Sequence, residues 1–483
     1  MRPSVVIVGA GITGLAAAWE LSGAEAGPGA DGPRIELIEA NDQVGGTLIT
    51  TTFAGRTIDL GPDGFLARRP EVTALVDEIG WRDRLEAIDA SGASIFLRGR
   101  LDEIPPGLAL GVPTSSKSLR RVRGLTWRAR LAARRDEVWP TRLAVRDDMS
   151  IGEILRMKLG RELTYQFIEP MVGGIQAGRV DDLSAKSVSP SLLDAARRGG
   201  SLMKALRPKE PAPATPVAPA TPSFYTLRDG VGALPVEIAR QLEARGVVLR
   251  RGTTVRALRR MTTGDYAWEV DTDTTTTPAD AVILAVPAPV AGQLLGRFDS
   301  ALESLSRVRS AGAAIVTFAL AREHVSLIEH GTGVLVPLAT AWSEGGTMMV
   351  TAITLLDRKW PHLRRDDDVI LRAHVGRIDD ERWQHMNDDE LSARVAREVR
   401  LLLGRFDEPY DALVQRWPAG LPQYDVGHDE LVERAKAASA VLGVALCGNA
   451  YDGVGIPASI GSGRRGARAV RQLLADRHDA RLR

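Results

Sequence analysis

The sequence predicts an α/β fold built around a parallel sheet, on three observations. Residues 5–8 form an apolar, β-branched run typical of a buried strand, and after a glycine-rich turn residues 15–21 have the pattern of a helix. A second apolar strand follows at residues 35–39, and another buried strand at residues 281–286. Because strands that alternate with helices pair in parallel, we expect these distant segments to lie in one sheet.

The glycine-rich turn has the spacing of a nucleotide-binding site. Gly9 permits the tight turn, Gly11 lets the backbone approach a pyrophosphate, and Gly14 lets the helix pack on the strand. The helix N-terminus adds free N–H groups and a partial positive charge. The turn therefore predicts a nucleotide cradle, made of Gly9, Ala10, Gly11, Ile12, Thr13 and Gly14.

The second strand ends on Glu39, about where a carboxylate meets the ribose hydroxyls of a bound dinucleotide. The alternative is that Glu39 merely caps the end of the strand. A glycine pair follows, which lets the backbone lie against the second half of a long dinucleotide and favours FAD over NAD. The cofactor contacts expected in this stretch are Glu39, Ala40, Gly45, Gly46 and Thr47.

Composition limits the remaining chemistry. The 483 residues are too many for one ordinary core, so two or three domains are expected. With 62 Lys and Arg against 61 Asp and Glu, the chain has no overall attraction to nucleic acid. Cys447 is the only cysteine, which excludes disulfides and a redox dithiol. The seven histidines lack metal-binding spacing, so we expect no metal and assign redox chemistry to the cofactor.

We expect no targeting segment and no segment that spans a bilayer. The first strand begins within a few residues of Met1, and the longest apolar stretch, residues 279–292, is interrupted and short. We therefore expect a cytoplasmic protein. Residues 117–146 are strongly basic with interspersed tryptophans and leucines, which indicates either a weak peripheral contact with anionic membrane or a solvated helical face.

We expect a discontinuous FAD-binding domain with two insertions. The first insertion is a helical subdomain that holds part of the substrate site, followed by a Pro/Ala-rich segment that cannot build a helix or a sheet ladder and is expected to be a flexible loop. The second is a more antiparallel, substrate-binding sheet domain. The expected bounds are 1–90, 225–295 and 425–483 for the FAD-binding domain, 91–207 for the helical subdomain, 208–222 for the loop and 296–424 for the sheet domain.

The end of the chain is expected to return to the cofactor. A strand ending at Cys447 is followed by a glycine-rich loop, and Pro457 begins a last helix whose N-terminus favours the negative charge of a reduced flavin. Residues 461–466 also match GxGxxG, but they lie inside this helix with too little chain left for a second βαβ unit. Without a second nucleotide motif we expect no bound NADPH, which favours an oxidase over a monooxygenase.

Arg68 and Arg69 stand at the entrance of a predicted helix, just after a Gly-Pro-Asp-Gly turn. Two guanidiniums at this point could clamp a carboxylate through paired hydrogen bonds. The alternative is a pair of solvated surface arginines.

These stretches together resemble the FAD-dependent porphyrinogen oxidases of haem biosynthesis, within the flavin amine-oxidase superfamily. The resemblance runs nearly from end to end, and it implies a six-electron aromatisation of a cyclic tetrapyrrole in three flavin cycles. Dioxygen would accept the electrons and give hydrogen peroxide. The stretches that match the family are residues 9–21, 61–66, 168–178, 416–424 and 448–457. The first of these marks only a dinucleotide-binding fold, whereas the last two are more specific to the family.

The resemblance also implies roles for individual residues. Hydride would pass from the substrate to flavin N5, so no catalytic side chain is expected. Substrate contacts are expected from Arg68, Arg69, Thr354 and His374, although His374 could also be an ordinary strand histidine. Further FAD contacts are implied for Gly61, Pro62, Asp63, Gly64, Val255, Trp417, Gly448, Val454, Gly455 and Ile456.

Departures from the family pattern at Gln176, Arg179 and residues 458–459 leave the side-chain preference for the porphyrinogen open. Similarity to soluble bacterial members and the lack of a hydrophobic membrane element favour coproporphyrinogen III over protoporphyrinogen IX. Two other functions remain alternatives: another flavin amine oxidase, and a flavin-carrying protein without turnover. The partners considered are the porphyrinogen, dioxygen and the next enzyme of haem biosynthesis.

Overall fold

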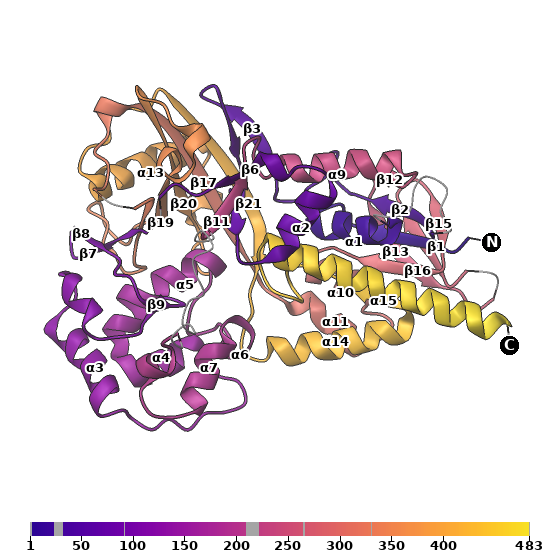
Figure 1. Ribbon diagram of the computed structural model, residues 1–483, viewed down its shortest axis with the longest axis horizontal. Helices are drawn as coiled ribbons and strands as arrows, with labels where there is room; N and C mark the ends of the chain where they lie inside the picture. Colours follow the sequence, from indigo (N-terminus) through magenta and orange to yellow (C-terminus); the bar gives the residue numbers. More distant parts are fainter. Residues whose placement is uncertain are drawn as a thin grey trace, which may run out of the picture.

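The fold is built on a parallel sheet, a larger mixed sheet and a group of helices beside them (Figure 1). The computed structural model describes residues 2–23, 32–90, 92–208, 222–263, 266–329 and 331–482. The Pro/Ala-rich segment expected at 208–222 therefore lies outside the described residues, except for its two end positions.

The parallel sheet confirms the predicted α/β class. Val5 pairs with Ile35 on one side and with Ala281 on the other, so segments far apart in sequence lie side by side. Every pairing in this sheet is parallel. The strand order is β12 (Val248–Arg250), β2 (Arg34–Ile38), β1 (Ser4–Val8), β16 (Ala281–Leu284) and β22 (Val444–Leu446).

Helices cover both faces of the parallel sheet. Val5 and Ile7 pack into one hydrophobic core, and Val6 and Val8 pack into another on the opposite face. Because neither face of β1 meets water, this strand is a continuous apolar run rather than an alternating one. The first face is covered by α1 (Ile12–Ser22), α9 (Ala233–Ala244) and α15 (Ile456–Leu482), and the second by α10 (Ala288–Leu295) and α14 (His428–Leu442).

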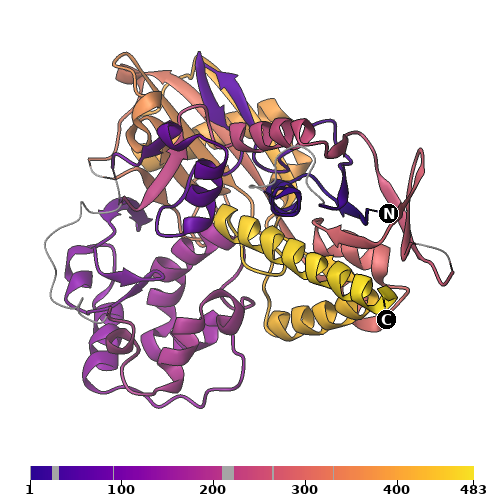
Figure 2. The same ribbon diagram turned by 45° about the vertical axis from the view of Figure 1, so that its right-hand side comes forward.

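Helix α15 (yellow) packs at close range against α1 (indigo), which Figure 2 views almost end-on. A Cβ on Gly463 would lie 2.1 Å from the Thr13 carbonyl oxygen, and a Cβ on Gly466 would lie 2.1 Å from Cys447 Sγ. These glycines therefore allow α15 to pack against α1 and against the end of β22. The literal GxGxxG at residues 461–466 is thus a helix-packing feature, in line with its predicted position inside a helix.

The mixed sheet forms the second layer of the molecule, at the upper left of Figure 1. Most of it comes from the expected sheet domain, and α13 (Asp388–Leu403) packs on it. Val334 pairs with Ser94, so residues 94–103 join this sheet and not the helices that follow them. The strand order is β21 (Asp411–Pro422), β17 (Ser310–Ala321), β20 (Asp368–Val375), β19 (Val350–Leu355), β18 (Gly333–Leu335), β7 (Ser94–Leu97) and β8 (Arg100–Glu103).

The helical part has its own hydrophobic core and lies at the lower left of Figure 1. Among the described residues, no helix combines the length and the apolarity that a membrane crossing requires. Its main helices are α3 (Trp127–Val138), α4 (Ile151–Glu162), the π-helical η3 (Leu163–Ile168), α5 (Glu169–Gln176) and α7 (Pro190–Arg197).

The remaining elements include small separate sheets, of which β13-β14-β15 and β5-β11-β6 have three strands each. The remaining α-helices and strands are α2 (Pro70–Glu78), α6 (Ala185–Val188), α8 (Leu202–Ala205), α11 (Ser300–Glu303), α12 (Leu356–Lys359), β3 (Thr50–Phe53), β4 (Arg56–Asp59), β5 (Phe65–Leu66), β6 (Leu85–Ala87), β9 (Leu108–Ala109), β10 (Val112–Pro113), β11 (Phe224–Leu227), β13 (Val255–Arg260), β14 (Trp268–Thr272) and β15 (Thr276–Ala279).

Candidate active site

The glycine turn after β1 packs tightly against the protein at Gly9 and Gly14 but leaves open space at Gly11. A Cβ on Gly9, which has φ 96°, would lie 2.4 Å from the Ala285 carbonyl oxygen, and a Cβ on Gly14 would lie 1.9 Å from the Gly9 carbonyl oxygen. At Gly11, in contrast, no atom of the described residues lies within 4 Å of the Cβ position. No side chain in the described part of the chain caps the first turn of α1. Open backbone at a helix N-terminus is the environment that binds a phosphate.

Glu39 ties this turn to the end of β2. Its buried carboxylate accepts hydrogen bonds from the Ala10 N–H at 2.7 Å and from the Asn41 backbone N–H at 3.0 Å. The Gly45 N–H donates to the Ala10 carbonyl at 2.9 Å, so the glycine pair lies against the turn. Glu39 therefore holds two loops together at a strand end, and its contact with ribose stays a prediction.

The loop before α15 leaves a second open stretch. The Gly448 N–H donates to Ser462 Oγ at 2.9 Å, and Ser462 hydrogen-bonds to Asp452. Burial opposes ionisation of Asp452, but the hydrogen bonds from Lys436, at 2.7 Å, and from Ser462 hold its pKa below the ordinary value. At Gly448 and Gly455, no described atom lies within 4 Å of the Cβ position.

The two open stretches fit the FAD that the sequence predicts. Gly11 leaves room for a pyrophosphate beside the N-terminus of α1, and Gly448 and Gly455 leave room beside the N-terminus of α15. Both helix ends favour the negative charges of a flavin dinucleotide.

A cavity of about 490 Å³ opens where the mixed sheet, helix α5 and the turn at residues 61–63 meet. Trp417 lines it and donates from Nε1 to the Leu60 carbonyl at 3.1 Å. An apolar cavity with a few polar groups is the usual form of a small-molecule site. Its apolar walls include Met171, Ile175, Ile315, Leu335, Val336 and Leu338.

A buried charge cluster lies at one wall of this cavity. Asp63 accepts hydrogen bonds from Lys359 Nζ at 2.8 Å and from Trp360 Nε1 at 3.0 Å. Burial opposes ionisation of Asp63, but Lys359 and Arg372 outweigh it and hold the pKa of this carboxyl well below its usual range. Asp63 is therefore an anion that offsets one of the cations in the wall.

Arg372, a third member of this cluster, has fewer hydrogen bonds than its guanidinium could make. Its Nη1 donates to the Gly61 carbonyl at 3.2 Å, but Nε and Nη2 have no hydrogen-bond partner among the described residues. Arg372 is only 2% exposed as a residue, so water does not solvate these groups freely. Buried donors without partners are costly, and a cavity-lining guanidinium of this kind is completed by an anionic or carbonyl ligand.

His374 and Thr354 face the same cavity from neighbouring strands. His374 Nε2 lies 3.2 Å from Thr354 Oγ1, which is hydrogen-bond distance. Burial, and then the nearby Arg372, lower the pKa of His374 to about 4. The imidazole is therefore neutral at pH 7 and suits an apolar substrate ring more than a carboxylate.

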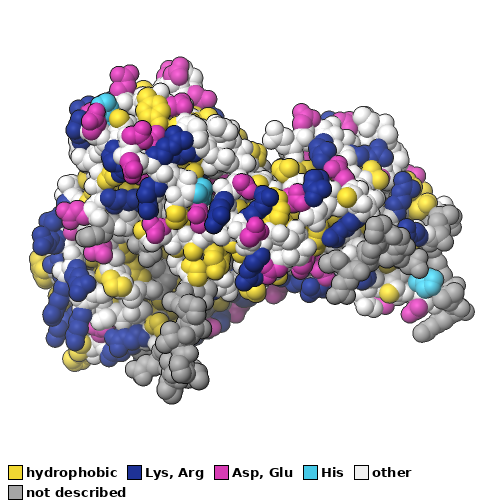
Figure 3. Space-filling model, turned by 45° about the horizontal axis from the view of Figure 1, so that its top comes forward, with side chains coloured by type: hydrophobic (Ala, Val, Ile, Leu, Met, Phe, Trp, Pro, Cys, Tyr) yellow, Lys and Arg dark blue, Asp and Glu magenta, His cyan; other side chains and the backbone are white. Residues whose placement is uncertain are grey.

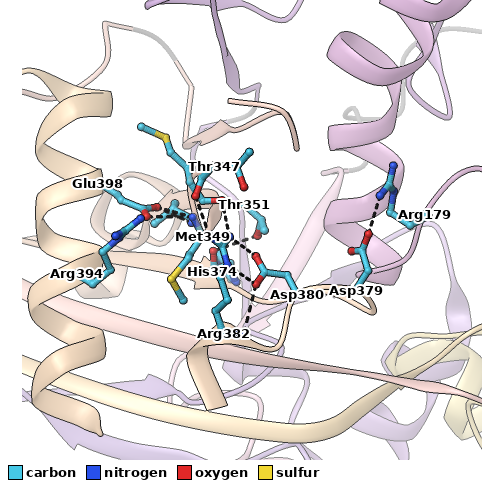
Figure 4. Close-up of polar contacts among 12 residues, drawn as sticks. Arg179, Thr347, Met349, Thr351, His374, Asp379, Asp380, Arg382, Arg394 and Glu398 are labelled. Atoms are coloured by element: carbon cyan, nitrogen blue, oxygen red, sulfur yellow. Dashed lines mark hydrogen bonds and ion pairs between the residues drawn. The ribbon is translucent and has the colours of Figure 1, made fainter. Parts of the chain in front are cut away.

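Ion pairs lie beyond the end of β20, around a surface pocket next to the cavity (Figure 4). Arg179 bridges Asp379, at 2.6 Å, and Glu169, at 3.1 Å. Glu169 Oε2 has no hydrogen-bond partner among the residues described, and burial, opposed by Arg179, raises the pKa of Glu169. Arg382 pairs with Asp380 at 2.6 Å.

Most of the residues predicted from sequence lie at these two sites. The cavity brings together Thr47, Gly61, Pro62, Asp63, Thr354, His374 and Trp417. Val255 packs beside the parallel sheet at the start of β13. Arg68 and Arg69 are exposed, Arg69 pairs with Glu71 at 2.7 Å, and neither arginine is among the described residues that line the cavity.

Sequence reasoning missed the cations of the cavity wall. Lys359, Arg372 and Arg377 all line the cavity, as does Glu169. Arg372 could have been found, because it stands two residues before His374 in a strand and so shares its face. Lys359 and Arg377 lie just outside regular strands, and no local pattern marks them.

Comparison with known proteins identifies the chain's relatives. The model of the family described as flavin containing amine oxidoreductase matches residues 12–471, which is most of the chain. The chain belongs to this family. It is an FAD-dependent oxidoreductase, and the resemblance inferred from the sequence is confirmed. That the two open stretches hold the FAD stays a prediction.

Named relatives and solved structures cover nearly the whole chain. The chain is 32% identical to a Bacillus subtilis (strain 168) protein named coproporphyrinogen III oxidase, over 96% of this chain and 97% of that one. A Mycobacterium leprae (strain TN) protein of the same name is also 32% identical, over 98% and 99%. A crystal structure from Exiguobacterium sp. 255-15, provisionally named protoporphyrinogen oxidase, has TM-score 0.84 and 31% identity over 97% and 99%.

Proposed function

We propose that this oxidoreductase converts coproporphyrinogen III to coproporphyrin III in haem biosynthesis, with dioxygen as electron acceptor and hydrogen peroxide as product. The observation that carries the proposal is the full-length similarity to proteins named coproporphyrinogen III oxidase. The cavity supports it, because apolar walls suit a tetrapyrrole ring and three cationic side chains, Lys359, Arg372 and Arg377, suit its carboxylates.

The chain's contribution to this reaction is binding and orientation. Bound FAD supplies the two-electron oxidation itself, so no side chain needs to act as a nucleophile. The apolar walls exclude water and hold a flat macrocycle, while the neutral His374 and Thr354 contact the ring. The FAD contacts are those predicted from the sequence, and the substrate site includes the 169–178 segment of the helical subdomain.

Two other substrates are less well supported. A protoporphyrinogen oxidase from Arabidopsis thaliana is 26% identical, below the 32% of the Bacillus subtilis and Mycobacterium leprae proteins named coproporphyrinogen III oxidase. Amine oxidases surround their flavin with aromatic side chains, whereas Trp417 is the only Phe, Trp or Tyr among the described residues that line this cavity. We therefore rank protoporphyrinogen IX second and an amine third.

Product formation in air tests the proposal. The purified protein, loaded with FAD, is mixed with coproporphyrinogen III, with protoporphyrinogen IX or with cyclohexylamine. We expect porphyrin fluorescence and hydrogen peroxide to rise fastest with coproporphyrinogen III, well above its spontaneous oxidation. Peroxide with the amine alone would replace the proposal by the amine-oxidase alternative, and no peroxide with any substrate would favour a flavin-carrying protein without turnover.

We also propose a weak peripheral contact between helix α3 and anionic membrane. Trp127, Leu131, Val138 and Trp139 are all more than half exposed, and arginines surround them on this helix. Figure 3 shows Lys and Arg side chains gathered at the left-hand edge of the molecule, the end at which α3 lies in Figure 1. Co-sedimentation with anionic vesicles, absent with neutral ones, tests this contact. A cytoplasmic location and a contact with the next haem-pathway enzyme stay predictions.

A further inference from the structure

Arg377 lies at the edge of the cavity, just beyond the end of β20. Gly376 precedes it, and a Cβ there would lie 2.6 Å from Trp383 Nε1, so the chain turns tightly against this ring. On the other side, the Ile378 N–H donates to the Ala177 carbonyl at 2.8 Å, which ties the segment to the end of α5. The side chain of Arg377 therefore starts from a fixed point in the cavity wall.

The acids next to Arg377 in sequence are already paired with other cations. Asp379 bonds Arg179 at 2.6 Å, and Asp380 bonds Arg382 at 2.6 Å (Figure 4). Within the part of the chain that the structure describes, the Arg377 guanidinium has neither a hydrogen bond nor an ion pair. This arginine is thus a half-buried cation without a direct ion pair in the described part of the chain. Burial lowers its pKa, and the nearby carboxylates of Asp379 and Asp380 oppose this shift only through space.

An anion is expected to approach Arg377 from the cavity side. Arg377 also lines a neighbouring surface pocket of about 320 Å³, but the acidic Glu381 lines that pocket too and does not line the cavity. Of the described residues that line the cavity, Asp63 and Glu169 are the acids, and each is paired with a cation. A carboxylate in the cavity therefore meets Arg377 without an unpaired acid in the cavity wall to repel it.

We propose that Arg377 binds a propionate carboxylate of the substrate while the apolar walls hold the macrocycle. The inference rests on the proposed function, because a porphyrinogen combines a flat ring with peripheral carboxylates. A guanidinium presents two parallel N–H donors to a carboxylate, and this geometry fixes the orientation of the ring as well as its affinity. The role differs from the one expected for Arg68 and Arg69, which do not line the cavity.

Binding of the stable porphyrin product tests this inference. Coproporphyrin III and its uncharged tetramethyl ester are titrated into the FAD-loaded protein, with fluorescence quenching as the readout. We expect Arg377→Met to weaken binding of the acid about 10- to 100-fold and to leave binding of the ester unchanged, because a charge-assisted hydrogen bond is lost only with the acid. Arg377→Lys should recover part of the loss, and flavin absorbance confirms that each variant folds.

Arg400→Met is the matched control, because Arg400 is exposed on α13 and does not line the cavity. In turnover, Arg377→Met should raise KM for coproporphyrinogen III about 10- to 100-fold while kcat stays within about twofold. Equal weakening of acid and ester, or no weakening of the acid, would overturn the role of Arg377. If the wild-type protein oxidises no porphyrinogen, the proposed function fails instead.

Discussion

The contact between α1 and α15 makes a sharp prediction about FAD binding. Gly463→Ala adds a Cβ 2.1 Å from the Thr13 carbonyl oxygen, 1.3 Å short of the 3.4 Å at which ordinary contact begins. The clash is with backbone, so a side-chain rotation cannot relieve it, and α15 must move away from α1. Because the N-termini of both helices border the FAD cradle, this movement should loosen the cofactor as well as the fold.

Gly461→Ala in the same helix is the matched control. Its Cβ would meet the flexible end of Arg465 at 3.2 Å, so the substitution should add only the helix preference of alanine, about 0.5 to 1 kcal/mol. Overpacking at Gly463 costs about 1 to 3 kcal/mol, from which the same helix preference must be subtracted. The two variants should therefore differ by about 1 to 3 kcal/mol, which for a chain of this length is a difference in Tm of about 1 to 3 °C.

Thermal unfolding and FAD titration check this prediction together. We expect Gly463→Ala to unfold at lower temperature and to bind FAD about 10-fold more weakly, while Gly461→Ala matches or exceeds the wild type. Equal unfolding temperatures and equal FAD affinities for the two variants would refute the reasoning that this helix crossing supports the cradle.

Two further predictions concern the cofactor and pH. Gly11→Ala should weaken FAD binding about 10-fold or more, because the added Cβ extends into the space where FAD is expected to bind. The stability of the FAD-free protein should change little. An unchanged FAD affinity would argue against the cradle. Burial raises the pKa of Asp59 to about 6, although the Gly232 N–H lowers it, so this carboxyl reduces stability progressively as pH rises from about 4 to about 6. Asp59→Asn should therefore gain about 3 kcal/mol relative to the wild type between pH 4 and pH 7 in urea unfolding, and a pH-independent difference would contradict this.

The glycine turn of the cradle could be predicted from the sequence, because the residues that form it are neighbours in the chain. Gly9, Gly11 and Gly14 follow a buried strand at fixed spacing, and the structure forms the turn that this spacing predicts. The cavity was only partly predictable, because it depends on contacts between segments far apart in the chain. Lys359 donates a hydrogen bond to Asp63, which lies far away in the sequence. No local sequence pattern near either residue predicts this pair.

The same limit applies to the boundary between the insertions. Residues 94–103 were expected with the helices that follow them, but they pair with β18 in the mixed sheet. Short strands without a strong alternating pattern leave their partners undetermined, since pairing depends on the sheet edge that the rest of the fold offers. Arg377 illustrates the consequence, because its position in the cavity wall follows from the end of β20 and from the Ile378–Ala177 hydrogen bond.

The central claim is that FAD bound in the cradle oxidises a porphyrinogen held in the adjacent cavity. Rapid anaerobic mixing of the yellow protein with coproporphyrinogen III tests it most directly, with flavin absorbance followed over time. We predict that the absorbance bleaches rapidly with coproporphyrinogen III, more slowly with protoporphyrinogen IX and not at all with cyclohexylamine. A flavin that stays oxidised with both porphyrinogens, or a colourless protein that takes up no added FAD, would contradict the account.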